Sequence, residues 1–429
     1  MPELLALFGG RPVQPQPLRS YVSIGREEKE AALRVMESGS LSGFVACGDD
    51  RFYGGPVVRE FESFFAGLLG IPYAVSFNSA TSGLVAAVGA LNLGLGDEVI
   101  VPAQTMSASA AAVLAYNAVP VFADVEERTY GLNPESVRSR ISEKTKALII
   151  VHLYGHPARM DELMAIAREH NLCVIEDCAQ SPLAKYHGSC TGLFGDISVF
   201  SFNFHKHANC GEGGVAVTRD TELRERLALV RNHGEVKGTS GNLSNTIGWN
   251  FRLTELQAAI ALEQTKKLPV LVEKRRKLAN RLSDILGQFD WIRAPFVEKD
   301  CKHSYYDFPM QMDLGRMGLT KEDILSMTQA ENLPITESYR PLYWQDIYQN
   351  KIVYGEQGFP FTQSLSEKNT HNYRRGSCPV AESMYESRCL TFEICSYDVG
   401  EEHMDQIGLM FRRIEQYARQ KEAGNAKQA

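Results

Sequence analysis

The stretch 199–218, which reads VFSFNFHKHANCGEGGVAVT, decides the fold. It begins with an apolar run typical of a strand, continues through Lys206 between two histidines, and ends in glycines and a second strand-like run. Ligands of α/β sheets bind at the carboxyl ends of strands, where the following loops place side chains. Lys206 occupies such a loop, and the segments on both sides of it indicate a chemical role rather than a surface position.

The composition is that of a globular protein without stabilising crosslinks. The chain has 429 residues, of which 44% are hydrophobic and 23% charged, which suits one large domain and a smaller one. A formal net charge of −7 argues against nucleic acid and anionic membrane surfaces, because both select clustered positive charge. The nine cysteines form no Cys-x-x-Cys pair and no zinc spacing, and no segment resembles a signal peptide or a membrane span. We therefore expect a cytoplasmic protein with reduced thiols and no metal.

Residues 25–235 alternate between helix-like and strand-like segments. The helix-like segments repeat apolar residues at helical spacing, and the strand-like runs are short and rich in β-branched residues. This alternation predicts βαβ units, and hence a mostly parallel sheet with helices on both faces. The clearest helical segments are 57–69 and 160–170, and the clearest strands are 98–101, 147–152 and 173–176.

The rest of the chain predicts a second, smaller α+β domain. Residues 253–286 read as helices that leave the first domain, and residues 359–375 read as a long polar loop. We also expect a strand over 304–312, a helix that begins at Thr320 and an amphipathic helix over about 401–420. The chain is therefore divided into an N-terminal arm (1–24), a large domain (25–252), and a helical connection with the small domain (253–429).

Three segments of the first domain end strands with groups that bind or react. The turn NSATSG places Thr81 and Ser82 at the start of a helix, where N–H groups and hydroxyls can hold a phosphate. Asp177 ends the run CVIED and can pair with a cationic ring nitrogen. Each segment alone has an ordinary explanation, a helix cap or a solvated acid. Together with the amine of Lys206, they supply the three groups that pyridoxal phosphate needs.

Burial gives Lys206 a route to reactivity. An apolar environment lowers the pKa of a lysine by up to about 3–5 units, so that a neutral amine is present at physiological pH. Such an amine can attack a carbonyl and later carry a proton.

Residues 211–216, GEGGVA, also satisfy the G-x-G-x-x-[G/A] pattern of dinucleotide-binding proteins. In that motif the glycines follow a strand and open a helix, whereas here a strand-like run follows them. We expect these glycines to permit positive φ and a close approach of the chain beside Lys206. A nicotinamide cofactor is therefore not expected.

The order of these segments resembles the sugar aminotransferases of the DegT/StrS group, pyridoxal-phosphate enzymes with the aspartate aminotransferase fold. The resemblance spans most of the chain and implies a seven-stranded type of sheet in the large domain. Its motifs are GPVVREFE (55–62), FNSATSGL (77–84), GDEVIVPAQT (96–105), IEDCAQS (175–181), FSFNFHKHANCGEGG (200–214), RNHG (231–234), GWNFRLTELQAA (248–259) and CPVAESMY (378–385).

The resemblance implies a role for each matched residue. Lys206 forms the Schiff base and carries the proton transfers, Asp177 binds the pyridine nitrogen, and Gln180 lies beside the ring. Met106 stands where relatives usually have a stacking aromatic residue, and a sulfur–aromatic contact can replace it. The implied phosphate ligands are Thr81, Ser82 and Ser201, with Asn250 reaching the cofactor of the neighbouring subunit. A homodimer with shared active sites is therefore part of the prediction.

The implied activity is transfer of an amino group from glutamate or glutamine to a keto-sugar, nucleotide-linked, or to a keto-cyclitol. The cofactor alternates between pyridoxal phosphate and pyridoxamine phosphate. Two alternatives stay open: a sugar dehydratase that uses the same cofactor, and a ligand sensor on the same fold. The dehydratase branch of the family has histidine in place of the lysine, and a sensor needs neither Lys206 nor Asp177.

The acceptor is expected to meet the chain at two segments, 338–348 and 359–375, which would shape the mouth of the site. In the first of these, Tyr339 and Tyr343 either face the site or pack the small domain. A nucleotide diphosphate would also need cations nearby, for which the candidates are Lys185, Arg340, Arg374 and Arg375.

Overall fold

The computed structural model describes residues 4–46, 49–235, 247–355 and 358–425. Its largest element is a seven-stranded sheet in the order β1-β9-β8-β5-β4-β2-β3. β9 pairs antiparallel with β1 and β8, and the other neighbours pair in parallel. The predicted mostly parallel sheet is confirmed. Its strands are β1 (Tyr73–Phe77), β2 (Glu98–Pro102), β3 (Val119–Ala123), β4 (Thr145–Val151), β5 (Cys173–Asp177), β8 (Ile197–Ser201) and β9 (Gly214–Thr218).

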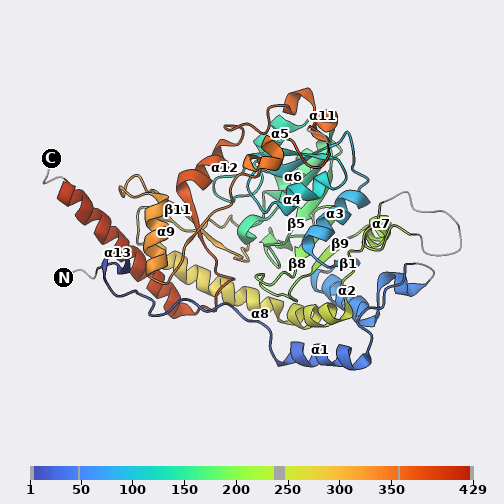
Figure 1. Ribbon diagram of the computed structural model, residues 1–429, viewed down its shortest axis with the longest axis horizontal. Coiled ribbons are helices and arrows are strands. Elements are labelled where there is room, and N and C mark those ends of the chain that lie inside the picture. Colours follow the sequence, from blue (N-terminus) through green and yellow to red (C-terminus); the bar gives the residue numbers. More distant parts are fainter. Residues whose placement is uncertain (1–3, 47–48, 236–246, 356–357, 426–429) are drawn as a thin grey trace.

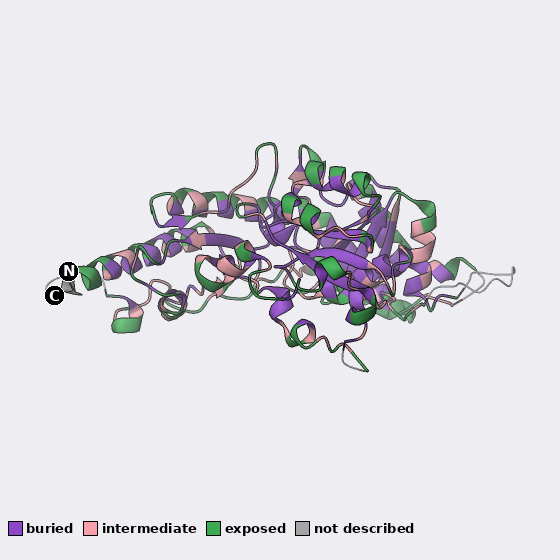
Figure 2. Ribbon diagram, turned by 90° about the horizontal axis from the view of Figure 1, so that it is seen from above, coloured by how far each residue is buried: buried purple, intermediate pink, exposed green. Residues whose placement is uncertain are grey.

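Helices cover both faces of this sheet (Figure 1). Successive strand residues point to opposite faces, so Val99 and Val101 of β2 pack with α3 and α4, while Ile100 between them packs with α5 and α6. Figure 2 shows buried residues concentrated in this sheet. The helices of this part are α1 (Arg26–Ser38), α2 (Pro56–Leu69), α3 (Ala80–Ala90), α4 (Ala108–Leu114), α5 (Pro134–Arg140), α6 (Met160–Glu169) and α7 (Thr221–Arg231).

Local sequence sets the ends of the helices that matter for the site. Pro56 opens α2, where its missing N–H is not needed, and Gly70 ends that helix at a φ of 69°. Ser79 caps α3, because its Oγ accepts a hydrogen bond from the N–H of Ser82 at 3.0 Å. This cap fixes the N-terminus of α3 just beyond the carboxyl end of β1.

A second, antiparallel sheet has the order β10-β11-β13-β12. Its apolar face packs against α9, α13 and the end of α8. The strand expected over 304–312 begins only at Phe308, because Tyr305 has a φ of 55° and the N–H of Tyr306 donates to the carbonyl of Tyr154. The predicted helices after Thr320 and from 401 are present. The elements are β10 (Ile292–Arg293), β11 (Phe308–Met312), α9 (Lys321–Ala330), β12 (Thr336–Glu337), β13 (Cys389–Phe392) and α13 (Glu401–Asn425).

A single long helix, α8 (Glu255–Leu286), joins the two sheets (Figure 1). The sequence predicted more than one helix here, but Pro269 lies inside a continuous run of 32 residues. At 1.5 Å per residue the helix spans about 48 Å. Leu262 packs with α2 in one core, and Leu282 packs with the four-stranded sheet in another.

The segment 359–375 covers the edge of the seven-stranded sheet, and does not border the site described below. Asn372 closes this edge at β3: its Oδ1 accepts from the N–H of Phe122 at 2.6 Å, and its Nδ2 donates to the Phe122 carbonyl at 2.7 Å. A covered edge cannot pair with a strand of another chain. The short elements not yet named are β6 (Lys185–Tyr186), β7 (Ser189–Cys190), α10 (Asp346–Gln349), α11 (Phe361–Ser364) and α12 (Pro379–Ser383).

None of the helices in the described ranges is both long enough and apolar enough to span a bilayer.

Candidate active site

A cavity of about 180 Å³ lies at the carboxyl ends of the central strands. Larger grooves of about 610 and 520 Å³ lie elsewhere on the surface, but this cavity brings an amine and a buried carboxylate together, so chemistry identifies it rather than size. Loops after β1, β2, β5 and β8 form most of its wall. Six of the residues predicted from the sequence line it, namely Thr81, Met106, Asp177, Gln180, Ser201 and Lys206.

The amine of Lys206 is held above an aromatic ring. Its Nζ lies 3.9 Å from the centre of the Tyr306 ring, in a cation–π arrangement. Burial of the amine lowers the pKa of Lys206 from 10.5 to about 8, although the charges of Asp307 and Asp177 oppose this shift. A substantial fraction of the amine is therefore neutral near physiological pH, as a nucleophile requires.

Asp177 is buried and hydrogen-bonded on both oxygens. Its Oδ2 accepts from the hydroxyl of Ser109 at 2.7 Å, and its Oδ1 accepts from the N–H of Ala179 at 3.1 Å. Burial raises the pKa of Asp177, while these two hydrogen bonds and the Lys206 charge favour the carboxylate. The carboxylate is thus fixed in direction at the end of β5.

The N-terminus of α3 lies at one end of the cavity. The first-turn N–H groups of a helix lack partners within the helix, and Thr81 adds a hydroxyl at the cavity wall. The glycines behave as predicted: Gly211 has a φ of 86°, and a Cβ on Gly214 would lie 2.5 Å from the nitrogen of Ala80. Gly214 therefore lets the start of β9 press against the first turn of α3.

Two predicted residues lie outside the cavity wall. Ser82 turns its hydroxyl to Asn78, donating to Oδ1 at 2.6 Å. Asn250 is exposed, and its Oδ1 accepts from Nε of Arg252 at 2.8 Å. Their roles toward a phosphate stay predictions.

Gln180 connects the cavity to the segment 338–348. Its Oε1 accepts from the N–H of Tyr154 at 2.7 Å, and its Nε2 donates to the hydroxyl of Tyr339 at 2.9 Å. Tyr339 lines the cavity, whereas Tyr343 packs against Phe122 in the core. Of the two tyrosines considered from the sequence, one therefore faces the site.

The two histidines beside Lys206 differ. His205 lines the cavity, and burial together with the Lys206 charge lowers its pKa. His207 is buried behind the loop, where its Nε2 donates to the carbonyl of Ser304 at 2.8 Å and burial lowers its pKa to about 3. His207 is therefore neutral and ties the lysine loop to the fold.

His152, Glu176 and Cys178 cluster next to Asp177 with metal-ligand geometry. Glu176 has no lone pair to spare, because it accepts from Nε2 of His152, the hydroxyl of Ser198 and three N–H groups of residues 192–195. Burial opposes its charge, but these donors hold the pKa of Glu176 below its usual value. We infer that this cluster is structural: it fixes the end of β5 to the segment 192–198.

Sequence reasoning missed four residues in or next to the cavity. Tyr306, which lines the wall, and Asp307 immediately precede β11 of the four-stranded sheet, and Ser109 of α4 contacts Asp177. Glu212 lines the wall and accepts from Nδ2 of Asn203 at 2.8 Å. No local pattern marks Ser109, whereas the adjacent acid and aromatic ring of Tyr306-Asp307 were a visible signal.

None of the four candidate cations for a diphosphate lines the cavity. The Arg340 guanidinium donates to the carbonyl of Trp344 at 3.3 Å, and Arg375 pairs with Glu386 at 2.9 Å. Lys185 belongs to β6, and Arg374 is exposed.

These residues fit pyridoxal phosphate. A buried amine, a buried carboxylate and a helix N-terminus with hydroxyls bound one cavity, so an aldehyde, a pyridine nitrogen and a phosphate each meet a complementary group. The close packing of Gly214 on Ser79 and Ala80 fixes the first turn of α3 beside the cavity.

Comparison with known proteins gives one family. The model of the DegT/DnrJ/EryC1/StrS aminotransferase family matches residues 44–391. The L-glutamine:2-deoxy-scyllo-inosose aminotransferase of Streptomyces lividus is 32% identical, covering 96% of this chain and 98% of the relative. The UDP-N-acetyl-3-dehydro-alpha-D-glucosamine 3-aminotransferase of Acidithiobacillus ferrooxidans is 34% identical, covering 85% and 90%. The solved structure of DesI in the presence of its TDP-sugar product has a TM-score of 0.81 at 26% identity, covering 98% and 99%.

Proposed function

The chain belongs to the DegT/DnrJ/EryC1/StrS aminotransferase family, and on this premise we propose that it is a pyridoxal-phosphate-dependent aminotransferase for a keto-sugar or a keto-cyclitol. The observation that carries the proposal is the meeting of Lys206, Asp177 and the N-terminus of α3 around one cavity. When bound, pyridoxal phosphate supplies an aldehyde that reversibly holds amino groups and a ring that accepts negative charge.

Each residue at the cavity has its own proposed role. Lys206, with a pKa of about 8, can give and take a proton near neutral pH, and Tyr306 stabilises its charged form. Asp177, oriented by Ser109, would pair with the pyridine nitrogen and keep it positively charged. The first turn of α3 with Thr81 would hold the phosphate, together with Ser201.

The amino donor is proposed to be glutamine or glutamate, and the acceptor a ketone on a cyclitol or on a nucleotide-linked sugar. The names of the two relatives support this range, because one is an aminotransferase for a keto-cyclitol with L-glutamine and the other for a UDP-linked keto-sugar. The cavity wall offers Glu212, Tyr339 and His205 as polar groups toward a hydroxylated acceptor.

We propose a homodimer whose subunits complete each other's sites. Met106 of the cavity wall is 54% exposed, and Phe204, which packs against His205 of the same wall, is 65% exposed. Asn250 is exposed as well, and a second copy would bury all three.

The test is a half-reaction followed by an acceptor panel. Purified protein loaded with pyridoxal phosphate is mixed with L-glutamine or L-glutamate, and the absorbance of the lysine-linked cofactor is followed together with release of the 2-keto acid. We expect conversion to pyridoxamine phosphate, and then amine formation with one member of a panel of keto-cyclitols and nucleotide-linked keto-sugars. A protein that releases water from the sugar without forming an amine would instead be a dehydratase, and one that shows no half-reaction would be a sensor.

A further inference from the structure

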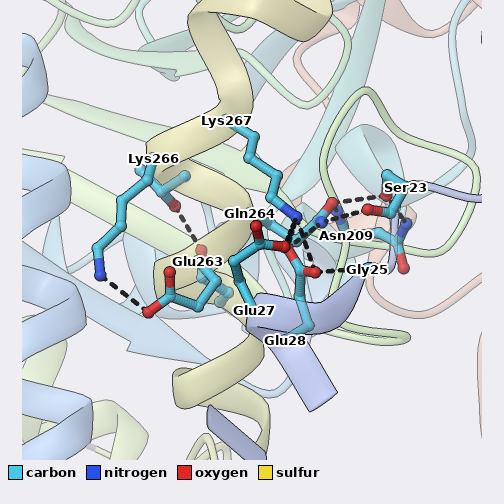
Figure 3. Close-up of polar contacts among 11 residues, drawn as sticks. Ser23, Gly25, Glu27, Glu28, Asn209, Glu263, Gln264, Lys266 and Lys267 are labelled. Atoms are coloured by element: carbon cyan, nitrogen blue, oxygen red, sulfur yellow. Dashed lines mark hydrogen bonds and ion pairs between the residues drawn. The ribbon is translucent and has the colours of Figure 1, made fainter. Parts of the chain in front are cut away.

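The side chain of Gln264, inside α8, is a buried hub between the lysine loop and the N-terminal segment of the chain (Figure 3). Its Oε1 accepts from the N–H of Asn209 at 3.2 Å and from the hydroxyl of Ser23 at 2.6 Å. Its Nε2 donates to the carbonyl of Ser23 at 3.1 Å and to Oε1 of Glu28 at 2.7 Å. All four hydrogen-bonding positions of the amide are therefore filled.

The lysine loop and the N-terminal segment also contact each other directly. Nδ2 of Asn209 donates to the hydroxyl of Ser23 at 3.2 Å. Asn209 lies three residues after Lys206, within a loop whose turn is closed by the N–H of Lys206 bonding to the carbonyl of Asn203. A shift of Asn209 therefore moves the backbone that carries the amine.

The N-terminal segment is itself anchored at both ends. Glu28 is buried, and its two oxygens accept from Lys267 at 2.8 and 2.9 Å and from the N–H of Gly25 at 2.6 Å. At the other end, the N–H of Tyr21 donates to the carbonyl of Ser396, next to the four-stranded sheet. Residues 19–28 thus run from the segment after β13, past the lysine loop, into α1.

We propose that Gln264, with Ser23, is a positioning residue for Lys206, and that residues 19–28 are part of the catalytic unit although none of them lines the cavity. The physical reason is that a small displacement of a catalytic group costs rate, whereas an amide with four hydrogen bonds in the core has a single position. This inference rests on the proposed function for its kinetic readout only.

The experiment compares three variants with matched chemistry. Gln264→Met keeps the length of the side chain and removes all of its hydrogen bonds. Ser23→Ala removes one hydroxyl from a partly exposed residue, so we expect this variant to fold. Lys266→Met is the control, because Lys266 bonds at 2.8 Å to Glu263 on the same helix, away from the loop (Figure 3). Each protein is measured well below its melting temperature.

Three readouts are taken. The first is deuterium exchange of the peptide that contains Asn209, and the second is the pH midpoint for acetylation of Lys206 in cofactor-free protein, followed by mass spectrometry. The third is kcat and KM for the amino donor. We expect faster exchange, a shifted midpoint and a kcat that is about 10- to 100-fold lower in Gln264→Met, a smaller change of the same sign in Ser23→Ala, and wild-type behaviour in Lys266→Met.

A folded Gln264→Met protein with lowered melting temperature but an unchanged midpoint and kcat would overturn the proposal, because the hub would then only stabilise the fold. If Gln264→Met does not fold, Ser23→Ala decides by the same three measurements. If wild-type protein shows no half-reaction, the proposed function fails, but exchange and acetylation still decide whether the hub positions Lys206.

Discussion

Nζ of Lys206 lies 3.9 Å from the centre of the Tyr306 ring. The reactive amine follows β8 of the seven-stranded sheet, and the ring belongs to the segment just before β11 of the four-stranded sheet. The ring stabilises the ammonium form. Replacing Tyr306 by Leu should therefore lower the pKa of Lys206, by about half to one unit. The pH dependence of Lys206 acetylation in cofactor-free protein measures this shift, and Tyr306→Phe, which keeps the ring, should match the wild type.

The amine itself is the group without which no half-reaction occurs. Lys206→Ala should lose the absorbance band of the lysine-linked cofactor, and turnover should fall at least about 10³-fold. Spectroscopy of the purified variant and a keto-acid assay measure both. A variant that retains the band would show that another residue holds the cofactor.

Ser109 orients the carboxylate of Asp177, and its contribution should appear in the affinity for the cofactor. Ser109→Ala removes the hydroxyl that donates to Asp177 at 2.7 Å, so the carboxylate loses a charge-assisted hydrogen bond. We expect pyridoxal phosphate to bind about 10- to 100-fold more weakly. Equilibrium titration of the cofactor-free protein gives the affinity. Ser107→Ala, which removes a hydroxyl from the same turn, should bind like the wild type.

Asp307 sets the charge around the lysine from the small sheet. It is 7% exposed, and burial, together with the charge of Glu393, raises its pKa to about 8. Its carboxylate form favours the ammonium of Lys206, so Asp307→Asn should move the midpoint of Lys206 acetylation to lower pH. The difference in the neutral fraction of Lys206 should be largest between the two midpoints, and it should vanish well above pH 8, where the amine is neutral in both proteins.

Glu393→Gln is the matched control for that experiment, because it also removes one carboxylate. Without Glu393, Asp307 ionises more readily, so the midpoint of Lys206 should stay or rise. Equal downward shifts in both variants would mean that the field of the small sheet as a whole, and not Asp307, acts on the lysine.

The hydrogen bonds of Asn372 at the sheet edge should contribute to the free energy of unfolding. Asn372→Ala leaves the N–H of Phe122 buried without a partner and its carbonyl with only the weak thiol donor of Cys378 at 3.8 Å, so the free energy of unfolding should fall by about 2–4 kcal/mol. Urea titration measures this, and Thr370→Ala at an exposed position nearby should change it little. Unchanged stability in Asn372→Ala would indicate that water reaches the edge.

Much of the site is predictable because strands end where loops begin. Lys206, Asp177 and the turn before α3 each follow an apolar run, and parallel strands bring such ends to the same edge of a sheet. The roles of two glycines were also predicted from the sequence. Gly211 has a positive φ, and Gly214 lies where a Cβ would collide with the backbone of α3.

What the sequence did not reveal depends on contacts between distant segments. The bond from Ser109 to Asp177 spans 68 positions, and Tyr306 reaches Lys206 from the other sheet. The sequence predicted more than one helix over 253–286, but packing at both ends keeps α8 continuous through Pro269. The polar loop 359–375 was predicted to border the substrate site. Instead, the side-chain amide of Asn372 in this loop hydrogen-bonds to the backbone of β3.

The 32-residue span of α8 has a consequence for how the protein can come apart. Leu262 and Leu268 complete a core that contains Phe61 and Phe65, while Leu282 and Leu286 complete the core of the small sheet. A fragment that ends before this helix would leave the first core open, and a fragment that begins after it would leave the second one open. Loss of α8 would therefore expose apolar side chains of both sheets at once.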